Sequence, residues 1–344
     1  MSEFRYDPIK RTWVILAAER GHRPSQYQSD IHAVQEPKIC PLCPGNESMT
    51  PPEVYAIRPS GTEPDGPGWQ VRVVPNKYPA LSTDYPFEPV FEGILSRTRG
   101  FGIHEVIIES PVKNRQMVDM EYTEIAEVLM VLRDRMKFHH RDRRFKTVIL
   151  FKNHGKEAGG SLVHSHSQMV ALPMVPDRVV SQLESFITHR DETSRCLMCE
   201  ILEKEVEDGS RIIFDECDFM VLSPYAASSP FQLNIVPETH SHDFSLSDDE
   251  NLNGFAAVLG DTLRCLRSVL GEHPWNMVWH TAPVNLSDEK DTTAYHWFVE
   301  ITPRLTNPAG FEMGSGFSIN TVAPEECAAL LREARSQNTE SRSD

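Results

Sequence analysis

The stretch VHSHSQMV at residues 163–170 decides the fold, because a weak copy of it, YHWFVEI, occurs at residues 295–301. Aligning the two stretches matches His164 with His296 and His166 with Phe298. Outward from them, each half of the chain repeats one order of elements: a CxxC pair, an apolar strand with a proline turn, a β-branched strand, a helix and a further strand. The sequence therefore predicts an internal duplication.

The repeated elements are expected at matching positions of the two halves. Strands are predicted over residues 71–75, 105–108 and 147–151, and again over 219–222, 232–236 and 276–279. Apolar residues at helical spacing predict helices over 120–137 and 255–270. We expect an α+β fold with an antiparallel sheet and packed helices in each unit. The predicted domains are 1–174 and 175–334, followed by a disordered tail at 335–344.

Composition excludes several classes of protein. The chain has 344 residues and a formal net charge of −16, which argues against a surface that binds nucleic acid, because phosphates require a basic stripe. No apolar run is long enough to span a membrane, and the N-terminus lacks the layout of a signal peptide. A cytoplasmic location is expected, where closely spaced cysteines favour metal binding over disulfides.

The HSHSQ motif carries the predicted chemistry. In an extended strand His164, His166 and Gln168 project to one side, and Ser165 and Ser167 to the other. Just upstream, a polar, glycine-rich turn contains small residues that allow a phosphate to approach the backbone, namely Asn153, Gly159, Gly160 and Ser161. An imidazole beside such a turn can attack phosphorus and form a covalent intermediate. The alternative is a chance pair of surface histidines.

Cysteine and histidine spacing predicts metal sites. In the second half, the pair Cys196 and Cys199 has the turn that brings two thiolates to one zinc ion, with His240 and His296 closing a Cys2His2 set. His242 is a rival for His240. These residue types would hold a structural zinc rather than a catalytic one, because the proposed chemistry needs no metal hydroxide.

The matching set in the first half is less complete. It contains Cys40, Cys43 and His164, but Lys113 occupies the position that corresponds to His240, and a protonated lysine is no zinc ligand. The site is expected to bind zinc more weakly, with His104, Asn114 or water as a fourth ligand, or to have lost its metal. Because Phe298 replaces His166 in the second half, one active site per chain is expected, in the first half.

Several motifs together resemble one family. Their order along the chain is FRYDP from residue 4, RGHRP from residue 20, VPNKYPAL from residue 74, HSHSQ from residue 164 and AGFEM from residue 309. In this the chain is similar to the galactose-1-phosphate uridylyltransferases, a branch of the histidine-triad superfamily. The resemblance implies that the two α+β units are histidine-triad-like.

The resemblance also implies roles for individual residues. His166 would be the nucleophile that takes a nucleotidyl group from a UDP-sugar, Gln168 would bind the transferred phosphoryl group, and a hexose 1-phosphate would then attack. Substrate-binding roles would fall to Arg20, Arg23, Asn76, Lys77, Asn153, Gly159, Gly160, Ser161, Phe311 and Glu312. The family also implies a homodimer in which the hexose-binding segment reaches across the interface.

Departures from the family pattern concern the substrate. Many uridylyltransferases have proline and glycine where this chain has Ser165 and Ser167, and the Ser-His-Ser-Gln form also resembles the adenylyl-transferring branch, ADP-glucose phosphorylase. The leading expectation is UMP transfer from UDP-glucose to galactose 1-phosphate. The alternatives are AMP transfer from an ADP-sugar and a catalytically silent protein that binds sugar nucleotides.

Overall fold

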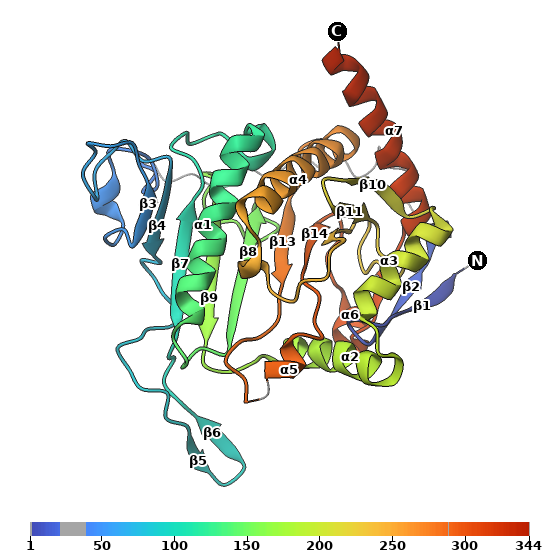
Figure 1. Ribbon diagram of the computed structural model, residues 1–344, viewed down its shortest axis with the longest axis horizontal. Coiled ribbons are helices and arrows are strands. Elements are labelled where there is room, and N and C mark those ends of the chain that lie inside the picture. Colours follow the sequence, from blue (N-terminus) through green and yellow to red (C-terminus); the bar gives the residue numbers. More distant parts are fainter. Residues whose placement is uncertain (1, 21–38, 288, 344) are drawn as a thin grey trace.

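One antiparallel sheet runs through both halves of the molecule. The computed structural model describes residues 2–20, 39–287 and 289–343. In this part of the chain, ten strands pair in the order β10-β11-β12-β14-β13-β8-β9-β7-β4-β3 (Figure 1). From the central β8–β13 pair outward, β8-β9-β7-β4-β3 in the first half repeats as β13-β14-β12-β11-β10 in the second. The expected α+β duplication is confirmed.

The strands of the large sheet fall close to their predicted ranges. In the first half they are β3 (Tyr55–Ile57), β4 (Val71–Pro75), β7 (Ile103–Ile108), β8 (Thr147–His154) and β9 (His166–Leu172). In the second half they are β10 (Ile212–Glu216), β11 (Phe219–Leu222), β12 (Leu233–Pro237), β13 (Trp275–His280) and β14 (Phe298–Pro303). The expected strand at 163–170 begins three residues later, so His164 and Ser165 precede β9.

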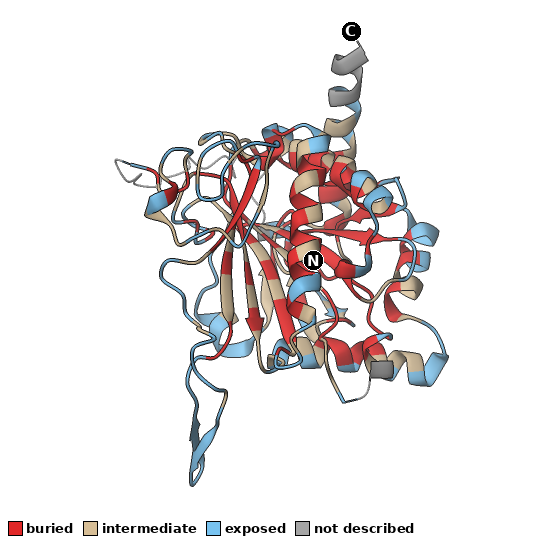
Figure 2. Ribbon diagram, turned by 60° about the vertical axis from the view of Figure 1, so that its left-hand side comes forward, coloured by how far each residue is buried: buried red, intermediate tan, exposed pale blue. Residues whose placement is uncertain are grey.

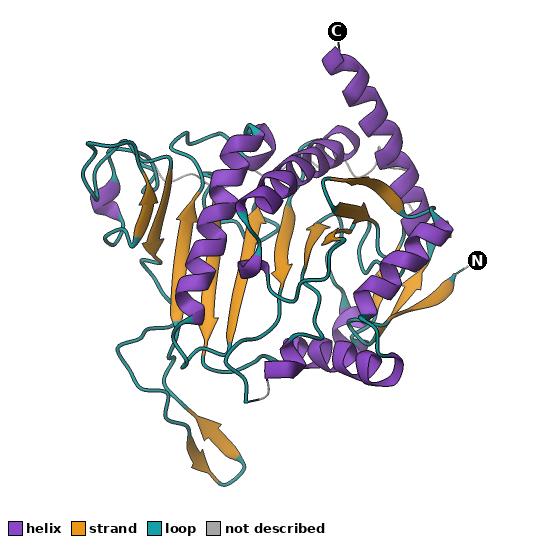
Figure 3. Ribbon diagram, in the orientation of Figure 1, coloured by secondary structure: helices purple, strands orange, loops and turns teal. Residues whose placement is uncertain are grey.

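Helices α1 (Tyr122–His140) and α4 (Asp249–Leu270) lie side by side across one face of the sheet (Figures 1 and 3). The Asp248 carboxylate caps α4 by accepting from Asn251 N at 2.8 Å. The helix ends at Leu270 and is capped by Gly271, whose φ of 69° suits glycine. The apolar stripe of α1 packs with sheet residues such as Ile107 and Met169 in the main core. Burying each such side chain contributes about 1.5–3 kcal/mol.

The opposite face of the sheet is covered differently in each half. In the second half, α2 (Asp177–Thr193) and α3 (Leu197–Asp208) share a smaller core with Leu222, Val236 and Phe298. In the first half, the segment around Cys40 packs on Val74 and Ile108. Strand alternation therefore places Ile108 and its partner His166 on the face away from α1.

The remaining elements lie outside the large sheet, and the last helix packs into the main core through Cys327, Ala328 and Leu331. They are the three-stranded sheet of β1 (Glu3–Asp7), β2 (Thr12–Leu16) and β15 (Ser318–Asn320), the exposed hairpin of β5 (Val90–Glu92) and β6 (Leu95–Arg97), and helices α5 (Glu289–Thr292), α6 (Gly310–Ser315) and α7 (Pro324–Ser343) (Figures 1 and 2). None of the described helices combines the length and apolarity needed to cross a membrane.

Two of the predicted domain boundaries, at residues 174 and 335, can be located on the elements of the structure. Residue 174 falls between β9 and α2. The stretch from Arg335, expected as a disordered tail, continues helix α7. The Arg335 guanidinium lies 2.5 Å from the Glu216 carboxylate and 4.0 Å from the ring centre of Phe214, so Arg335 belongs to the packed structure.

Candidate active site and metal centres

His166 opens strand β9 with its ring in a defined tautomer. Its Nδ1 lies 2.8 Å from the backbone oxygen of His164, to which it donates, so Nε2 carries the available lone pair. Burial lowers the pKa of His166 below its usual range, although the His164 carbonyl opposes this shift. A neutral imidazole held in one orientation is the form that can act as a nucleophile.

Beneath His166, on the helix-covered side of the sheet, lies a buried polar cluster. Lys152 Nζ contacts Glu109 Oε2 at 2.6 Å, Ser165 Oγ at 2.9 Å and the His166 carbonyl at 3.2 Å. The Ser165 and Ser167 hydroxyls both donate to Glu109, at 2.6 and 2.5 Å. The two serines therefore share one side of the segment, as strand alternation predicted.

The charges of this cluster compensate each other. Burial would by itself raise the pKa of Glu109, but the charge of Lys152 and the hydrogen bonds from Lys152, Ser165 and Ser167 lower it overall. The carboxylate therefore stays ionised although its side chain has no exposed surface. Because Lys152 also donates to the His166 carbonyl oxygen, the cluster holds the backbone of His166 in position.

A cavity of about 500 Å³ opens beside His166. The glycine-rich turn contributes Asn153, Gly155 and Leu162 to its lining. This turn closes by a 2.9 Å hydrogen bond from Gly160 N to Gly155 O, and a Cβ at Gly160 would lie 2.8 Å from that oxygen. Glycine is therefore required at 160, and the turn can approach a ligand closely.

Gln168 lies two residues further along the same face of β9. Its Oε1 is 2.8 Å from His104 Nε2, which also lies 3.2 Å from Asn76 Nδ2. The shorter contact assigns the His104 proton to Gln168 Oε1, which leaves the amide NH2 of Gln168 as its donor group. His104 thereby orients Gln168, a role different from that of metal ligand considered for it from the sequence, and in this tautomer its Nε2 cannot also accept from Asn76.

The second-half metal set assembles as predicted. Cys196, Cys199, His240 and His296 bring one ligand atom each to within 4.8 Å of one another. The distances from Cys199 Sγ to the Nδ1 atoms of His296 and His240 are 3.5 and 4.0 Å, close to the ~3.6 Å that tetrahedral zinc requires between sulfur and nitrogen ligands. The cluster contains His240, not its rival His242.

The first-half set assembles with three members. Cys40 Sγ and Cys43 Sγ lie 3.5 and 3.6 Å from His164 Nδ1. His164 Nε2 donates to Ser110 O at 2.7 Å, as His296 Nε2 does to Pro237 O at 2.8 Å. Both rings therefore present Nδ1 to the cysteines, the orientation that a bound metal needs.

Among the described His, Cys, Asp and Glu residues, none adds a fourth ligand to the first set. His104 contacts Gln168 instead, and Asn114 or water as the fourth ligand stays a prediction. Both clusters could bind zinc, the four-residue one as a closed structural site.

Comparison with known proteins assigns the family. Residues 1–176 match the family model described as "Galactose-1-phosphate uridyl transferase, N-terminal domain". The chain is 36% identical to "ADP-glucose phosphorylase" of Arabidopsis thaliana, over 96% of this chain and 92% of that protein. The chain belongs to the galactose-1-phosphate uridylyltransferase family. Members are nucleotidyltransferases that act on hexose 1-phosphates, and the chain is an enzyme of this kind.

Two further comparisons, with a curated protein and with a solved structure, give the same family. A "Galactose-1-phosphate uridylyltransferase" of Thermotoga maritima is 30% identical over 97% of this chain and 98% of its own length. The crystal structure of the Arabidopsis thaliana ADP-glucose phosphorylase with bound ADP-glucose superposes with a TM-score of 0.81 at 32% identity, covering 97% of this chain and 99% of that one. These full-length matches confirm the family resemblance.

The residues that the family resemblance linked to substrate do not all line the cavity beside His166. Arg23 lies outside the described residues, and Arg20 is described only by its backbone in a short 3-10 helix. The exposed Lys77 donates to Met49 O at 3.0 Å. Phe311 and Glu312 lie in α6, where the Glu312 carboxylate caps the helix at Ala309 N, and neither lines the cavity beside His166. Their role in a hexose site, and the homodimer, stay predictions.

Sequence reasoning missed the buried cluster under the uridylyltransferase-family motif. The available signal was Lys152, a lysine that directly follows the strand predicted at 147–151 and lies within β8 of the structure. An ionisable residue in a buried strand requires a partner. That partner, Glu109, directly follows the strand at 105–108, but only the pairing of β7 with β9 brings the two halves of the cluster together.

We expect His240→Ala to weaken zinc binding at the second-half cluster by about 100-fold or more, because it removes one of four ligands. His242→Ala is the matched control, since His242 lies two residues away and outside the cluster. Zinc per chain, measured by elemental mass spectrometry after dialysis against a weak chelator, should fall by one equivalent only in His240→Ala. Equal zinc in both variants would contradict the assignment.

Proposed function

We propose that this enzyme transfers AMP from ADP-glucose to inorganic phosphate through a covalent bond to His166. The observation that carries the proposal is the 36% identity, over nearly the whole chain, to a protein named ADP-glucose phosphorylase, against 30% for the uridylyltransferase of Thermotoga maritima. The solved structure with bound ADP-glucose supports the same choice. The Ser-His-Ser-Gln form of the motif, whose serines both bind Glu109, agrees with it.

The first half-reaction forms the nucleotidyl-enzyme. His166 Nε2 attacks the α-phosphorus of ADP-glucose, a P–N bond forms, and the bond from that phosphorus to the bridging oxygen breaks to release glucose 1-phosphate. The positive charge that develops on the ring is stabilised by the Nδ1–H bond to the His164 carbonyl, which is already formed in the free enzyme.

The second half-reaction regenerates His166. An oxygen of inorganic phosphate attacks the AMP phosphorus, the P–N bond breaks, and ADP leaves. In both steps the Gln168 amide, oriented by His104, is the candidate donor to the phosphoryl oxygens. From the glycine-rich turn, Asn153 and Gly155 line the cavity, whereas the amides of Gly159 and Gly160 donate within the turn itself.

Uridylyl transfer from UDP-glucose to galactose 1-phosphate is the second candidate. It is supported by the family model and by the uridylyltransferase relatives. It uses the same nucleophile and differs only in the base and the acceptor. A catalytically silent protein that binds sugar nucleotides is the least supported candidate, because binding alone does not require the His166 ring to be held in one orientation.

Intact-mass spectrometry at non-acidic pH tests the proposal. After incubation with ADP-glucose, the protein should gain the mass of one AMP group and lose it when phosphate is added; UDP-glucose in a parallel sample should give little adduct. A UMP adduct that galactose 1-phosphate removes would favour the second candidate. Absence of an adduct with both sugars would favour the silent binder.

A further inference from the structure

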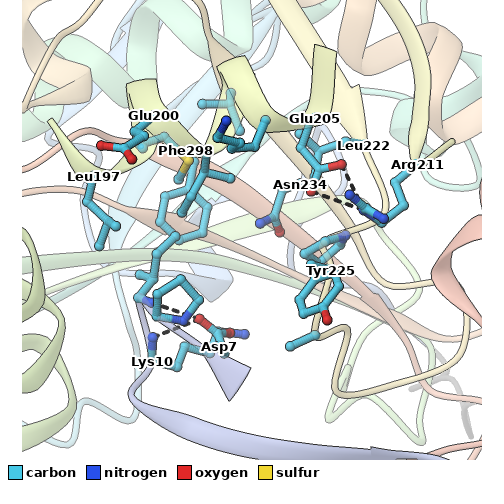
Figure 4. A pocket seen from close by; sticks show the side chains of 18 of the residues that line it. Asp7, Lys10, Leu197, Glu200, Glu205, Arg211, Leu222, Tyr225, Asn234 and Phe298 are labelled. Carbon is cyan, nitrogen blue, oxygen red and sulfur yellow. Dashed lines mark hydrogen bonds and ion pairs between the residues drawn. The ribbon is translucent and has the colours of Figure 1, made fainter. Parts of the chain in front are cut away.

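The second half of the molecule has a cavity of its own, of about 430 Å³, but this cavity lacks a nucleophile. It is enclosed by the β1 end of the chain, helix α3, and strands β11, β12 and β14, with Asn234 on its wall (Figure 4). Phe298 lies there at the position that corresponds to His166, and a phenyl ring cannot attack phosphorus (Figure 4). A contribution of the second half to the reaction is therefore expected at the first-half site.

Strand β13 brings the second half into contact with the glycine-rich turn beside His166. It pairs with β8 at the centre of the sheet (Figure 1), and Asn276 lies directly opposite Asn153. The Asn276 Nδ2 atom is 2.7 Å from Asn153 Oδ1 and 2.8 Å from Ala158 O. One amide group of β13 therefore holds two points of the turn with its two hydrogens.

The orientation of the Asn276 amide is fixed from its other side by Arg304. A guanidinium can only donate, so the Asn276 atom that Arg304 Nε contacts is the oxygen. The NH2 group of Asn276 then faces Asn153 and Ala158, and the atom that each of them presents must accept. The oxygen of Asn153 is thereby used, and its NH2 group is left as a donor.

This NH2 group of Asn153 belongs to the cavity beside His166. Asn153 lines that cavity, and no described residue accepts a hydrogen bond from its Nδ2. Nδ2 is absent from the buried side-chain atoms that lack a partner, so the atom is accessible. Gly159 adds no side chain over it, since a Cβ at Gly159 would lie 3.7 Å from Nδ2.

We infer that Asn276 is a positioning residue for nucleotidyl transfer: it turns the Asn153 amide so that its NH2 group donates to an oxygen of the transferred phosphoryl group. A donor that is already oriented stabilises the transition state without having to reorganise. The second half thus contributes to a reaction that it cannot perform. The inference rests on the proposed transfer through His166, and it holds for AMP and UMP alike because both carry the same phosphoryl group.

Initial rates of nucleotidyl transfer in a double-variant cycle test the inference. Asn153→Ala should lower kcat about 100-fold, because one donor to a phosphoryl oxygen is lost. Asn276→Ala should lower kcat about 10-fold, because the Asn153 amide can then turn either way. The double variant should stay within about 2-fold of Asn153→Ala, since Asn276 acts only through Asn153. Losses that multiply to about 1,000-fold in the double variant would overturn the inference.

Asn276→Asp separates positioning from support of the fold. Its carboxylate still accepts from Arg304 but cannot donate, so Asn153 should turn its NH2 group toward the carboxylate and its oxygen toward the cavity. The value of kcat should fall about 100-fold, further than in Asn276→Ala, although urea denaturation should find Asn276→Asp at least as stable. A higher kcat in Asn276→Asp than in Asn276→Ala would contradict the positioning role. Asn253→Ala, at an exposed position of α4, is the control and should keep the wild-type rate.

The choice of sugar nucleotide keeps this inference apart from the proposed function. A wild type that uses UDP-glucose but not ADP-glucose would refute AMP transfer, and the cycle would then be measured with UDP-glucose. Failure of the cycle in an active enzyme would refute only the role of Asn276. A wild type that forms no nucleotidyl adduct with either sugar would overturn both.

Discussion

Replacing His166 with glycine is expected to lower the rate of nucleotidyl transfer by about 10⁴-fold or more, because it removes the proposed nucleophile. The expected cause is chemical rather than structural. His166 is buried but borders the cavity, so circular dichroism of the variant checks that loss of the ring leaves the fold intact. Initial rates with ADP-glucose and phosphate, and with UDP-glucose and galactose 1-phosphate, measure the effect.

His242→Gly is the control for His166→Gly. His242 lies in the second half, outside the metal clusters and away from the catalytic cavity, so its rate should stay within about 2-fold of the wild type. Intact-mass spectra of both variants should contain a nucleotidyl adduct only in His242→Gly. An adduct on His166→Gly would rule out His166 as the nucleophile.

Lys152→Met is expected to destabilise the protein by about 3–5 kcal/mol, because it leaves the buried Glu109 carboxylate without a cationic partner. Lys152 is 2% exposed and contacts Glu109, Ser165 and the His166 carbonyl. Its loss should also reduce nucleotidyl transfer, since the His166 backbone loses a partner. Urea denaturation measures the free energy of unfolding.

The double variant Lys152→Met/Glu109→Gln separates the stranded charge from lost packing. The glutamine is neutral, and its Oε1 can accept from one serine while its NH2 group donates to the other, so the double variant should be more stable than Lys152→Met alone. Arg97→Met, which breaks the exposed pair with Glu92, should cost less than about 1 kcal/mol. Equal destabilisation by Lys152→Met and the double variant would contradict the role assigned to the ion pair.

The sequence by itself determined the repeated order of elements and most of the residues of the metal clusters. This was possible because strand alternation and helical spacing are local properties, and because a duplicated chain provides its own alignment. Matching His164 with His296 indicated two metal sets, and matching His166 with Phe298 indicated one reactive half. The family motifs then predicted the nucleotidyltransferase chemistry.

Only the tertiary structure decided how residues from different strands meet. The pairing of β7, β8 and β9 brings Glu109, Lys152 and Ser165 into one buried cluster and places His104 against Gln168. It also selects His240 over His242 as a cluster member. Such contacts depend on sheet register and on the path of loops, which no local spacing encodes. The cavity at Asn234 likewise exists only where α3, the β1 end and three strands converge.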